Sequence, residues 1–369
     1  MAARLIVNHY ENWLLPGSSE DSRLFHADSS DQILLYPDHV GQGYRQQIKL
    51  RDDLTLVIMN YLTHREVILN GLFAGNSNAK FEFPIRGMRQ GCSSFFPTFN
   101  LKGLGVVPVG KPVLEVEVIF QGAALTLDYA QTCVDRFHPQ TQQLVEATVQ
   151  HFWRSQGGRS GLSVAEMLRR IQARIARWDR ITKYDYWLYS PLCDHIYMSS
   201  IDLEYANRLP ITTEMETIIG QILSCPYQGA ARRQYLEQKA LELVTLRIEA
   251  IAHPNLHPVE LDCIHQAAAI LRRHLVHPPS VEKLARQVNT NRLKLNQGFH
   301  AAYGVTPYQY LRDCRLWMAK RLLTLSTLSV EQIAGAVGYS SRNHFAKAFR
   351  KQTGLNPKLF QMLAWPNAS

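Results

Sequence analysis

The stretch IAGAVGYSSRNHFAKAFRKQTGLNP, residues 333–357, predicts two short helices joined by a tight turn. Ser329 precedes the first helix, and its hydroxyl can accept hydrogen bonds from the unpaired N–H groups there. Gly338 ends that helix, because glycine adopts a positive φ without strain. Ser340 or Ser341 then caps the second helix as Ser329 caps the first. We therefore expect a helix-turn-helix unit at this point of the chain.

The second of these helices has two different faces. Phe345, Ala348 and Phe349 are spaced by three and four residues, so they form one apolar stripe. The opposite face is polar and basic, with Arg342, Asn343, Lys347 and Arg350. Such a helix fits the major groove of DNA, where Arg and Asn can read base edges. An ordinary amphipathic hairpin would also show this pattern.

The pattern occurs once before, in LARQVNTNRLKLNQGFHAAYGVTPYQYL at residues 284–311. Later positions match at a shift of 50 residues, with one extra residue in the turn of the second copy: Leu295 with Phe345, Phe299 with Phe349, and Gly304 with Gly354. Ser280 and Asn291 are the predicted caps of its two helices. Its outer face carries Arg292, Asn296, Gln297 and His300. Two matched copies make a pair of unrelated hairpins a poor explanation.

The segment between the copies, PYQYLRDCRLWMAKRLLTLS at residues 307–326, also has helical spacing. Pro307 suits the first turn of a helix, where its missing N–H is not needed. A helix of 18 residues would be about 27 Å long at 1.5 Å per residue. It would hold two reading helices roughly one turn of DNA apart, on the same face of the duplex.

The positive charge of the chain is concentrated around this repeat. Residues 259–369 hold 15 Lys and Arg against 5 Asp and Glu, a net charge of +10. The first 258 residues hold 25 against 26, a net charge of −1. A basic module on a near-neutral body predicts a polyanionic partner such as nucleic acid.

Taken together, these residues resemble the signature of the AraC/XylS family of transcription regulators: Ile-Ala on a helix, then Gly-aromatic, an aromatic, Phe-Arg/Lys, Gly and Pro. The resemblance extends from Val259 or Pro278 to Ala364. It implies a seven-helix domain with two helix-turn-helix units on a long helix, and a sensing or dimerising domain at the other end of the chain. The run KLNQGF and the upstream CPYQGAARRQYLEQKALELVTLRIEAI are similar to the branch of pyochelin-type siderophore regulators.

The resemblance also implies which side chains read bases. In the first unit they are Arg292, Asn296 and Gln297, and in the second Arg342, Asn343, Ala346 and Lys347, while Arg350 would contact phosphate. Asn291, His300 and Ser341 complete the predicted DNA-contacting set. Many family members carry Arg where this chain has Gln297. Because Gln prefers adenine and Arg prefers guanine, the base preference at that position differs from theirs.

The first part of the chain has strand-like patterns rather than motifs. Residues 48–69, 80–85 and 113–120 are rich in β-branched residues with partial alternation, which favours a β-sandwich or a cupin-like barrel. Glycine-rich GLGVVPVG at 103–110 and the segment 87–91 are predicted loops, and Arg86 and Arg89 are candidates for contact with an anionic effector.

Helical patterns follow at 141–153, 164–178 and 232–252. In the last of these, apolar residues form one stripe that suits either packing on the sheet or a dimer face, with packing favoured: Leu236, Ala240, Leu243, Val244, Ile248 and Ile251. His253-Pro254 and His257-Pro258 predict a domain boundary, because the residue before proline is disfavoured in a helix. Pro254 also argues against a helical metal pair formed by the two histidines.

Composition narrows the class of protein. The chain has 369 residues, of which 46% are hydrophobic and 19% charged, which excludes a disordered or fibrous chain. No run of about 18 apolar residues predicts a membrane span, and the start lacks the pattern of a secretory signal. Six cysteines without a CxxC motif predict reduced thiols and a cytoplasmic location. Patterns of nucleophilic, nucleotide-binding or zinc sites are missing.

The sequence therefore predicts an α+β protein in three parts. Residues 1–132 form a β-rich effector-sensing domain, residues 133–258 a helical sensor extension with a possible role in dimerisation, and residues 259–369 an all-α double helix-turn-helix domain. The expected function is a sequence-specific transcription regulator, an activator, that responds to a small molecule such as a ferric siderophore. Double-stranded DNA is the expected partner, with RNA polymerase and a second copy of the chain as further candidates. No enzyme activity, cofactor or metal is predicted.

Two rival functions remain at this point. The first is an enzyme domain fused to a DNA-binding tail, as in base-modifying repair proteins, which need a reactive cysteine in a defined setting. The second is an architectural protein without sequence preference, which would place basic wedges in the minor groove rather than paired reading helices.

Overall fold

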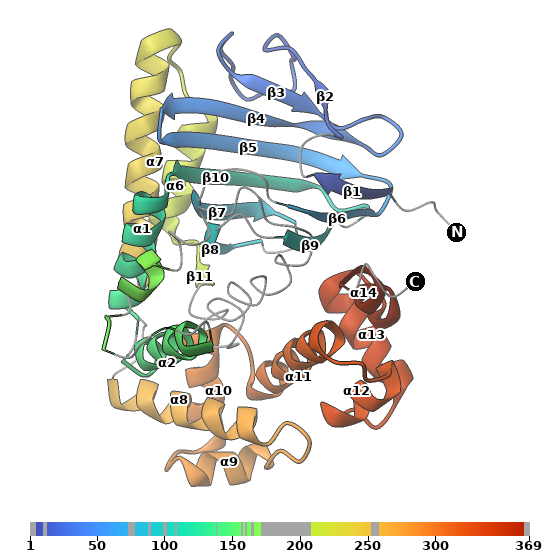
Figure 1. Cartoon of the computed structure of the whole chain (residues 1–369). Helices are drawn as coiled ribbons and strands as arrows, with labels where there is room; N and C mark the ends of the chain where they lie inside the picture. Colours follow the sequence, from blue (N-terminus) through green and yellow to red (C-terminus); the bar gives the residue numbers. More distant parts are fainter. Residues whose placement is uncertain are drawn as a thin grey trace. The chain divides into compact units, whose positions relative to one another are not determined.

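The computed structural model describes residues 5–9, 13–72, 78–87, 90–98, 102–107, 109–137, 139–155, 158, 161–163, 166–170, 208–251 and 258–364. The chain divides into two compact units. The β-rich unit comprises Met1–Gly103 and Val107–Ala252, and the helical unit comprises Leu104–Val106 and His253–Ser369. Figure 1 shows the strands of the first and the helices of the second.

The strands of the β-rich unit form two sheets. The larger contains β2 (Leu15–Pro16), β3 (Gln32–Leu35), β4 (Gly41–Arg51), β5 (Leu54–Thr63), β7 (Asn78–Arg86), β8 (Cys92–Thr98), β10 (Val113–Gln121) and β11 (Leu209–Pro210), in the order β11-β8-β7-β10-β5-β4-β3-β2. Its described pairs are antiparallel. The smaller has the order β1 (Leu5–His9), β6 (Val67–Leu72), β9 (Lys102–Val107), with β1 parallel to β6. The predicted strands are confirmed, but the glycine-rich stretch predicted as a loop begins with strand β9.

One face of the larger sheet is apolar because apolar and polar residues alternate along its strands, and successive side chains point to opposite faces. On β10, Val116, Val118 and Phe120 point to this face and are buried, while Glu115 and Glu117 point to the other. Three helices contribute to the same core: α1 (Ala123–Asp135), α6 (Thr213–Leu223) and α7 (Gly229–Ile251). In Figure 1, α1, α6 and α7 stand together at one side of the sheet.

The apolar stripe of helix α7 packs into the core of the β-rich unit. The six predicted stripe residues, from Leu236 to Ile251, are all buried in the core that includes the sheet. The packing interpretation is therefore right, and this stripe is not a free dimer face. The boundary predicted after residue 132 falls inside α1, and α6 and α7 share their core with the sheet rather than forming a separate extension. Apolar contacts across the boundary explain why one compact unit contains both parts.

The other predicted elements of this region are partly described. The helix predicted at 141–153 is α2 (Pro139–Ser155). Of the helix predicted at 164–178, residues 166–170 are helical, and residues 164–165 and 171–178 lie outside the described part. The predicted junction at 253–257 also lies outside it, next to the division between the two units.

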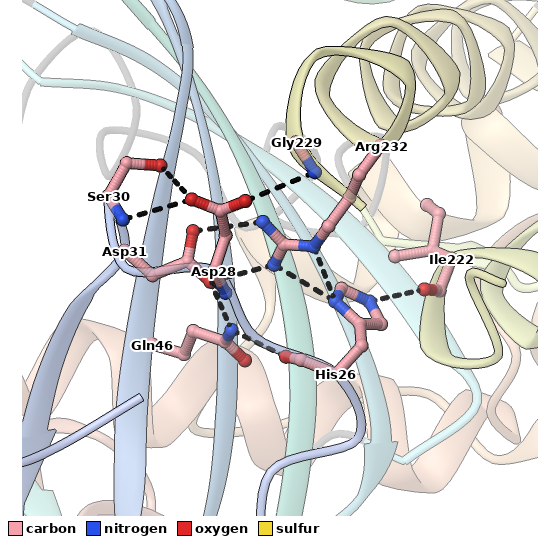
Figure 2. Close-up of polar contacts among 8 residues, drawn as sticks. All are labelled: His26, Asp28, Ser30, Asp31, Gln46, Ile222, Gly229 and Arg232. Atoms are coloured by element: carbon pink, nitrogen blue, oxygen red, sulfur yellow. Dashed lines mark hydrogen bonds and ion pairs between the residues drawn. The ribbon is translucent and has the colours of Figure 1, made fainter. Parts of the chain in front are cut away.

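A buried ion pair fastens the segment before β3 to the start of α7 (Figure 2). The Arg232 guanidinium donates to both carboxylate oxygens of Asp31, at 3.0 and 2.7 Å, and both side chains are 1% exposed. Gln46 donates to the same carboxylate at 2.8 Å. His26 lies between Arg232, 3.1 Å from Nε to Nδ1, and the Ile222 carbonyl, 2.8 Å from Nε2. This network joins residues far apart in the sequence.

Each hydrogen bond of the His26 ring in this network can be assigned a donor and an acceptor. Since the Arg232 Nε–H can only donate, His26 Nδ1 accepts and Nε2–H donates to Ile222. Burial lowers the pKa of His26 and the positive charge of Arg232 lowers it further, against the opposing effects of Ile222 and Asp31. Asp28 accepts a hydrogen bond from the Gly229 N–H at 3.1 Å, at the positive N-terminus of α7.

The helical unit has seven helices over residues 258–364, all of which are described: α8 (Pro258–Arg273), α9 (Val281–Gln287), α10 (Arg292–Tyr303), α11 (Pro307–Leu325), α12 (Val330–Ala336), α13 (Arg342–Thr353) and α14 (Pro357–Ala364). The number implied by the family resemblance is confirmed. Helix α11 contacts α8 and α10 on the one hand and α12, α13 and α14 on the other. It is therefore the element that both helix-turn-helix units share.

Local signals set the ends of these helices as predicted. Ser280, Asn291, Ser329 and Ser341 each accept a hydrogen bond from the N–H three residues later, at the starts of α9, α10, α12 and α13. Gly304 and Gly354 end α10 and α13 with φ of 69° and 78°, a left-handed conformation that a residue with a Cβ rarely adopts. The caps and stops thus repeat in both copies.

Candidate nucleic-acid interface

The first reading helix, α10, turns its polar face outward because its apolar face is anchored. Leu295 and Phe299 are fully buried, and Phe299 packs against the Tyr303 and Tyr310 rings. Helical spacing then leaves Arg292, Gln297 and His300 exposed. All three side chains are therefore accessible on the outer face of α10.

The side chains of two other predicted DNA contacts, Asn291 and Asn296, form hydrogen bonds with the backbone of α10 itself. Asn291 Oδ1 accepts from the Lys294 N–H at 2.9 Å as the N-cap. Asn296 Nδ2 donates to the Arg292 carbonyl at 3.0 Å, so its amide lies along the helix and is half-buried. Their assignment as DNA contacts stays a prediction. For Asn296, reading a base requires it to leave this hydrogen bond.

The second reading helix, α13, has the same construction. Phe345 and Phe349 are fully buried with the rings of Tyr339 and Phe360 beside them. The outer face exposes Arg342, Asn343, Lys347 and Arg350. Ser341 caps the helix through the His344 N–H, at 3.5 Å. Ala346, implied by the family resemblance, is half-buried on the same helix.

The N-termini of both reading helices suit phosphate oxygens. Neither α10 nor α13 has an acidic residue in its first turn, whereas α9 and α12 have Glu282 and Glu331. The free N–H groups and positive dipole end of a helix attract anions. Both helices predicted to enter a groove therefore leave this positive end without a carboxylate of their own.

Sequence reasoning missed exposed residues on these helices. Leu293 follows Arg292 and is 67% exposed, and Lys294 and His344 are also exposed. A large apolar side chain on the outer face of a reading helix can contact a thymine methyl group. The signal was available, since Leu293 lies off the stripe of Leu295 and Phe299.

The β-rich unit holds a second group of functional candidates on the sheet face opposite α1, α6 and α7. Its members are Arg45, Lys80, Glu82, Glu115 and Glu117, which the sequence did not single out. Lys80 Nζ lies 3.0 Å from Glu117 and also pairs with Glu82, and Arg45 Nη1 lies 3.5 Å from Glu117. Burial alone would raise the pKa of Glu117, but the charges of Lys80 and Arg45 outweigh it and lower that pKa.

One carboxylate oxygen from each of Glu82, Glu115 and Glu117 lies within 4.8 Å of the other two, a spacing that could suit a metal ion. Lys80 already places a positive charge between Glu82 and Glu117, so the arrangement is that of an ion-pair network. The predicted effector contact Arg86 lies exposed at the end of β7, and Arg89 is outside the described residues.

Parts of the chain are similar to known regulatory proteins. A model of a helix-turn-helix domain matches residues 284–362, from α9 into α14. The regulatory protein PchR of Pseudomonas aeruginosa is 36% identical over 121 residues, 31% of this chain and 41% of that protein. The transcriptional regulator AlkR of Acinetobacter baylyi is 35% identical over 114 residues, 31% of this chain and 35% of that protein. The arabinose operon regulatory protein of Salmonella typhimurium is 25% identical over 145 residues, 39% and 52% of the two chains.

The chain carries an AraC-type helix-turn-helix domain. A second model, of the regulatory protein PchR N-terminal domain, matches residues 100–261. The family resemblance drawn from the sequence is thereby confirmed, and so is the α+β class with its β-rich N-terminal and helical C-terminal parts. The aligned part of the chain spans less than half the length of PchR and of AlkR.

Two solved structures each align with less than a third of this chain. An AraC-type regulator from Chromobacterium violaceum is 27% identical over 29% of this chain and 96% of that one, with a TM-score of 0.27. The DNA-binding domain of AdpA, solved with a target DNA, is 29% identical over 28% and 97%, with the same TM-score. Among the described residues, no helix combines the length and apolar character needed to cross a bilayer.

Proposed function

We propose that this chain is a sequence-specific regulator of transcription that binds double-stranded DNA through α10 and α13. The observation that carries the proposal is the duplication itself. Each copy anchors a helix by buried rings and exposes Arg at its first position, with no acidic residue in the first turn. An activator role, contact with RNA polymerase, pairing of two copies and a cytoplasmic location belong to the same proposal.

Sequence-specific binding is tested first with the unaltered chain. Duplexes selected from a random pool should share a preferred sequence, and they should bind more tightly than unrelated duplexes at physiological ionic strength. Equal affinity for all duplexes would contradict the proposal and would favour an architectural protein. An enzyme with a DNA-binding tail would also show sequence preference, and it would be recognised by turnover of a substrate.

Replacing Arg342 with alanine should weaken binding to the selected duplex by about 1–3 kcal/mol and relax the preference at one base pair. Arg342 is exposed at the first position of α13, where a guanidinium can reach a base edge. Titrations with duplexes altered at single base pairs measure both effects.

Arg350 is the matched control, since it is exposed on the same helix but one turn from its end. Its replacement by alanine should weaken binding to all duplexes similarly and reduce the salt slope by about one unit. If the Arg342 variant loses affinity equally on every duplex, Arg342 contacts phosphate and not a base.

The effector is the second part of the proposal, and a ferric siderophore is the first candidate. The match of residues 100–261 to the PchR N-terminal domain and the sequence resemblance to siderophore regulators support it. A ligand that binds the folded chain should stabilise it by RT ln(1 + [L]/Kd), about 2.7 kcal/mol at a hundredfold excess over Kd. We expect ferric pyochelin to raise the melting temperature of the full chain, with metal-free pyochelin and ferric citrate as controls. The same melting temperature with and without ferric pyochelin would reject this class of effector.

A further inference from the structure

The two copies of the helix-turn-helix unit differ in one ion pair. In the first copy, Glu282 in the first turn of α9 accepts a hydrogen bond from Arg292 at the start of α10, with 2.9 Å between Oε1 and Nη1. The two side chains are 51% and 69% exposed. The pair joins the supporting helix to the first residue of the reading helix.

The second copy has the same two residue types without the contact. Glu331 lies two residues after its cap Ser329, as Glu282 lies two residues after Ser280, and Arg342 begins α13 as Arg292 begins α10. Both are exposed, and the hydrogen bonds and ion pairs of this fully described region do not join them. The extra residue in the second turn explains the difference, because it changes the spacing between glutamate and arginine from ten residues to eleven.

The geometry leaves Arg292 able to read a base while it is held. Glu282 engages Nη1, so the edge formed by Nε and Nη2 still has donors for the O6 and N7 atoms of guanine. Because the ion pair already restricts the Arg292 side chain in the free protein, less side-chain conformational entropy is lost when it contacts DNA. The carboxylate also offsets the attraction of Arg292 to any phosphate, which is the interaction that does not depend on sequence.

We propose that Glu282 is a positioning residue that directs Arg292 toward a base rather than a phosphate, and so increases the discrimination of the first reading helix. The inference rests on the proposed function and goes beyond it, because it assigns unequal roles to the two copies. Glu331 has no such role, and Arg342 reaches DNA without a carboxylate that orients it.

The test compares Glu282→Gln with Glu331→Gln in the full chain. Each removes one negative charge at the same position of a supporting helix and retains the shape of the side chain. Affinities are measured on the selected duplex and on duplexes altered singly at each base pair, at several salt concentrations. We expect Glu282→Gln to tighten binding to altered duplexes more than to the selected one, and to reduce discrimination by about two- to fivefold, the factor that an exposed ion pair supplies. Glu331→Gln should tighten binding to all duplexes by a common factor.

An Arg292→Ala background separates positioning from a general charge effect. In that background, Glu282→Gln should no longer change discrimination at any base pair, because the side chain that it orients is gone. Equal loss of discrimination in Glu282→Gln and Glu331→Gln, or the same loss with Arg292 absent, would overturn the inference. Failure of the unaltered chain to prefer any duplex would instead overturn the proposed function.

Discussion

Replacing Asp31 with alanine is expected to lower the free energy of unfolding of the β-rich unit by about 3–5 kcal/mol. The change leaves the Arg232 guanidinium buried without its carboxylate, and it removes one of the two acceptors of the Gln46 amide. A charge in a buried site is strongly destabilising when its partner is removed. The effect should spread to the start of α7 and to the segment around His26, because the same network holds both.

Hydrogen exchange of α7 and β4 peptides in the full chain measures this effect region by region. The control is Asp52→Ala, which removes a fully exposed partner of Lys49 and should leave exchange in both elements unchanged. A double variant, Asp31→Ala with Arg232→Met, should exchange more slowly than Asp31→Ala alone, since no charge is left buried there. Protection in Asp31→Ala equal to that of the Asp52 variant would show that the pair does not stabilise the unit.

Replacing Phe349 with alanine is expected to destabilise the second helix-turn-helix unit by roughly 3–5 kcal/mol. The Phe349 ring is fully buried, with the Phe345 and Phe360 rings at 5.6 and 5.3 Å between centroids. Its core also includes Leu316 and Leu323 of α11. Removal of the ring would leave a cavity between α11, α13 and α14, because a packed core closes only partly around a lost side chain.

The measurement is again hydrogen exchange, now of peptides from α12, α13 and α14. Lys347→Ala changes an exposed residue of the same helix and should leave exchange in these peptides unchanged. Peptides from α7 and the sheet serve as an internal reference, because the β-rich unit has a separate core. If the Phe349 variant keeps full protection in α13, the ring does not have the central packing role assigned to it.

Local signals made the helical unit predictable. The caps Ser280 and Ser329 act on N–H groups three residues away, and Phe345 and Phe349 lie one helical turn apart, so each signal is complete within a few residues. The outward faces of α10 and α13 followed from the same periodicity. Asn296 was harder to assign, because a hydrogen bond from its side chain to its own helix leaves no mark in the pattern.

Two of the features that escaped prediction depend on long-range pairing. Asp31 and Arg232 are 201 residues apart, and no periodicity relates them. Glu117 fits an alternating strand with polar residues facing water, yet it is 2% exposed. Lys80 of the neighbouring strand β7 and Arg45 of β4, two strands away, accompany it. The pair of Glu282 and Arg292 is close in sequence, but the turn geometry decides whether the two side chains meet.

The packing of α7 limits how two copies of this chain can associate. A coiled coil through the residues between Leu236 and Ile251 would require pulling the helix off the sheet and exposing the apolar residues beneath it. Self-association that preserves the fold must therefore involve other surfaces of the protein. Substitutions along the buried stripe would then affect dimer formation only by destabilising the fold of each subunit. A change in the monomer–dimer equilibrium of such a variant would indicate partial unfolding and not the loss of an interface.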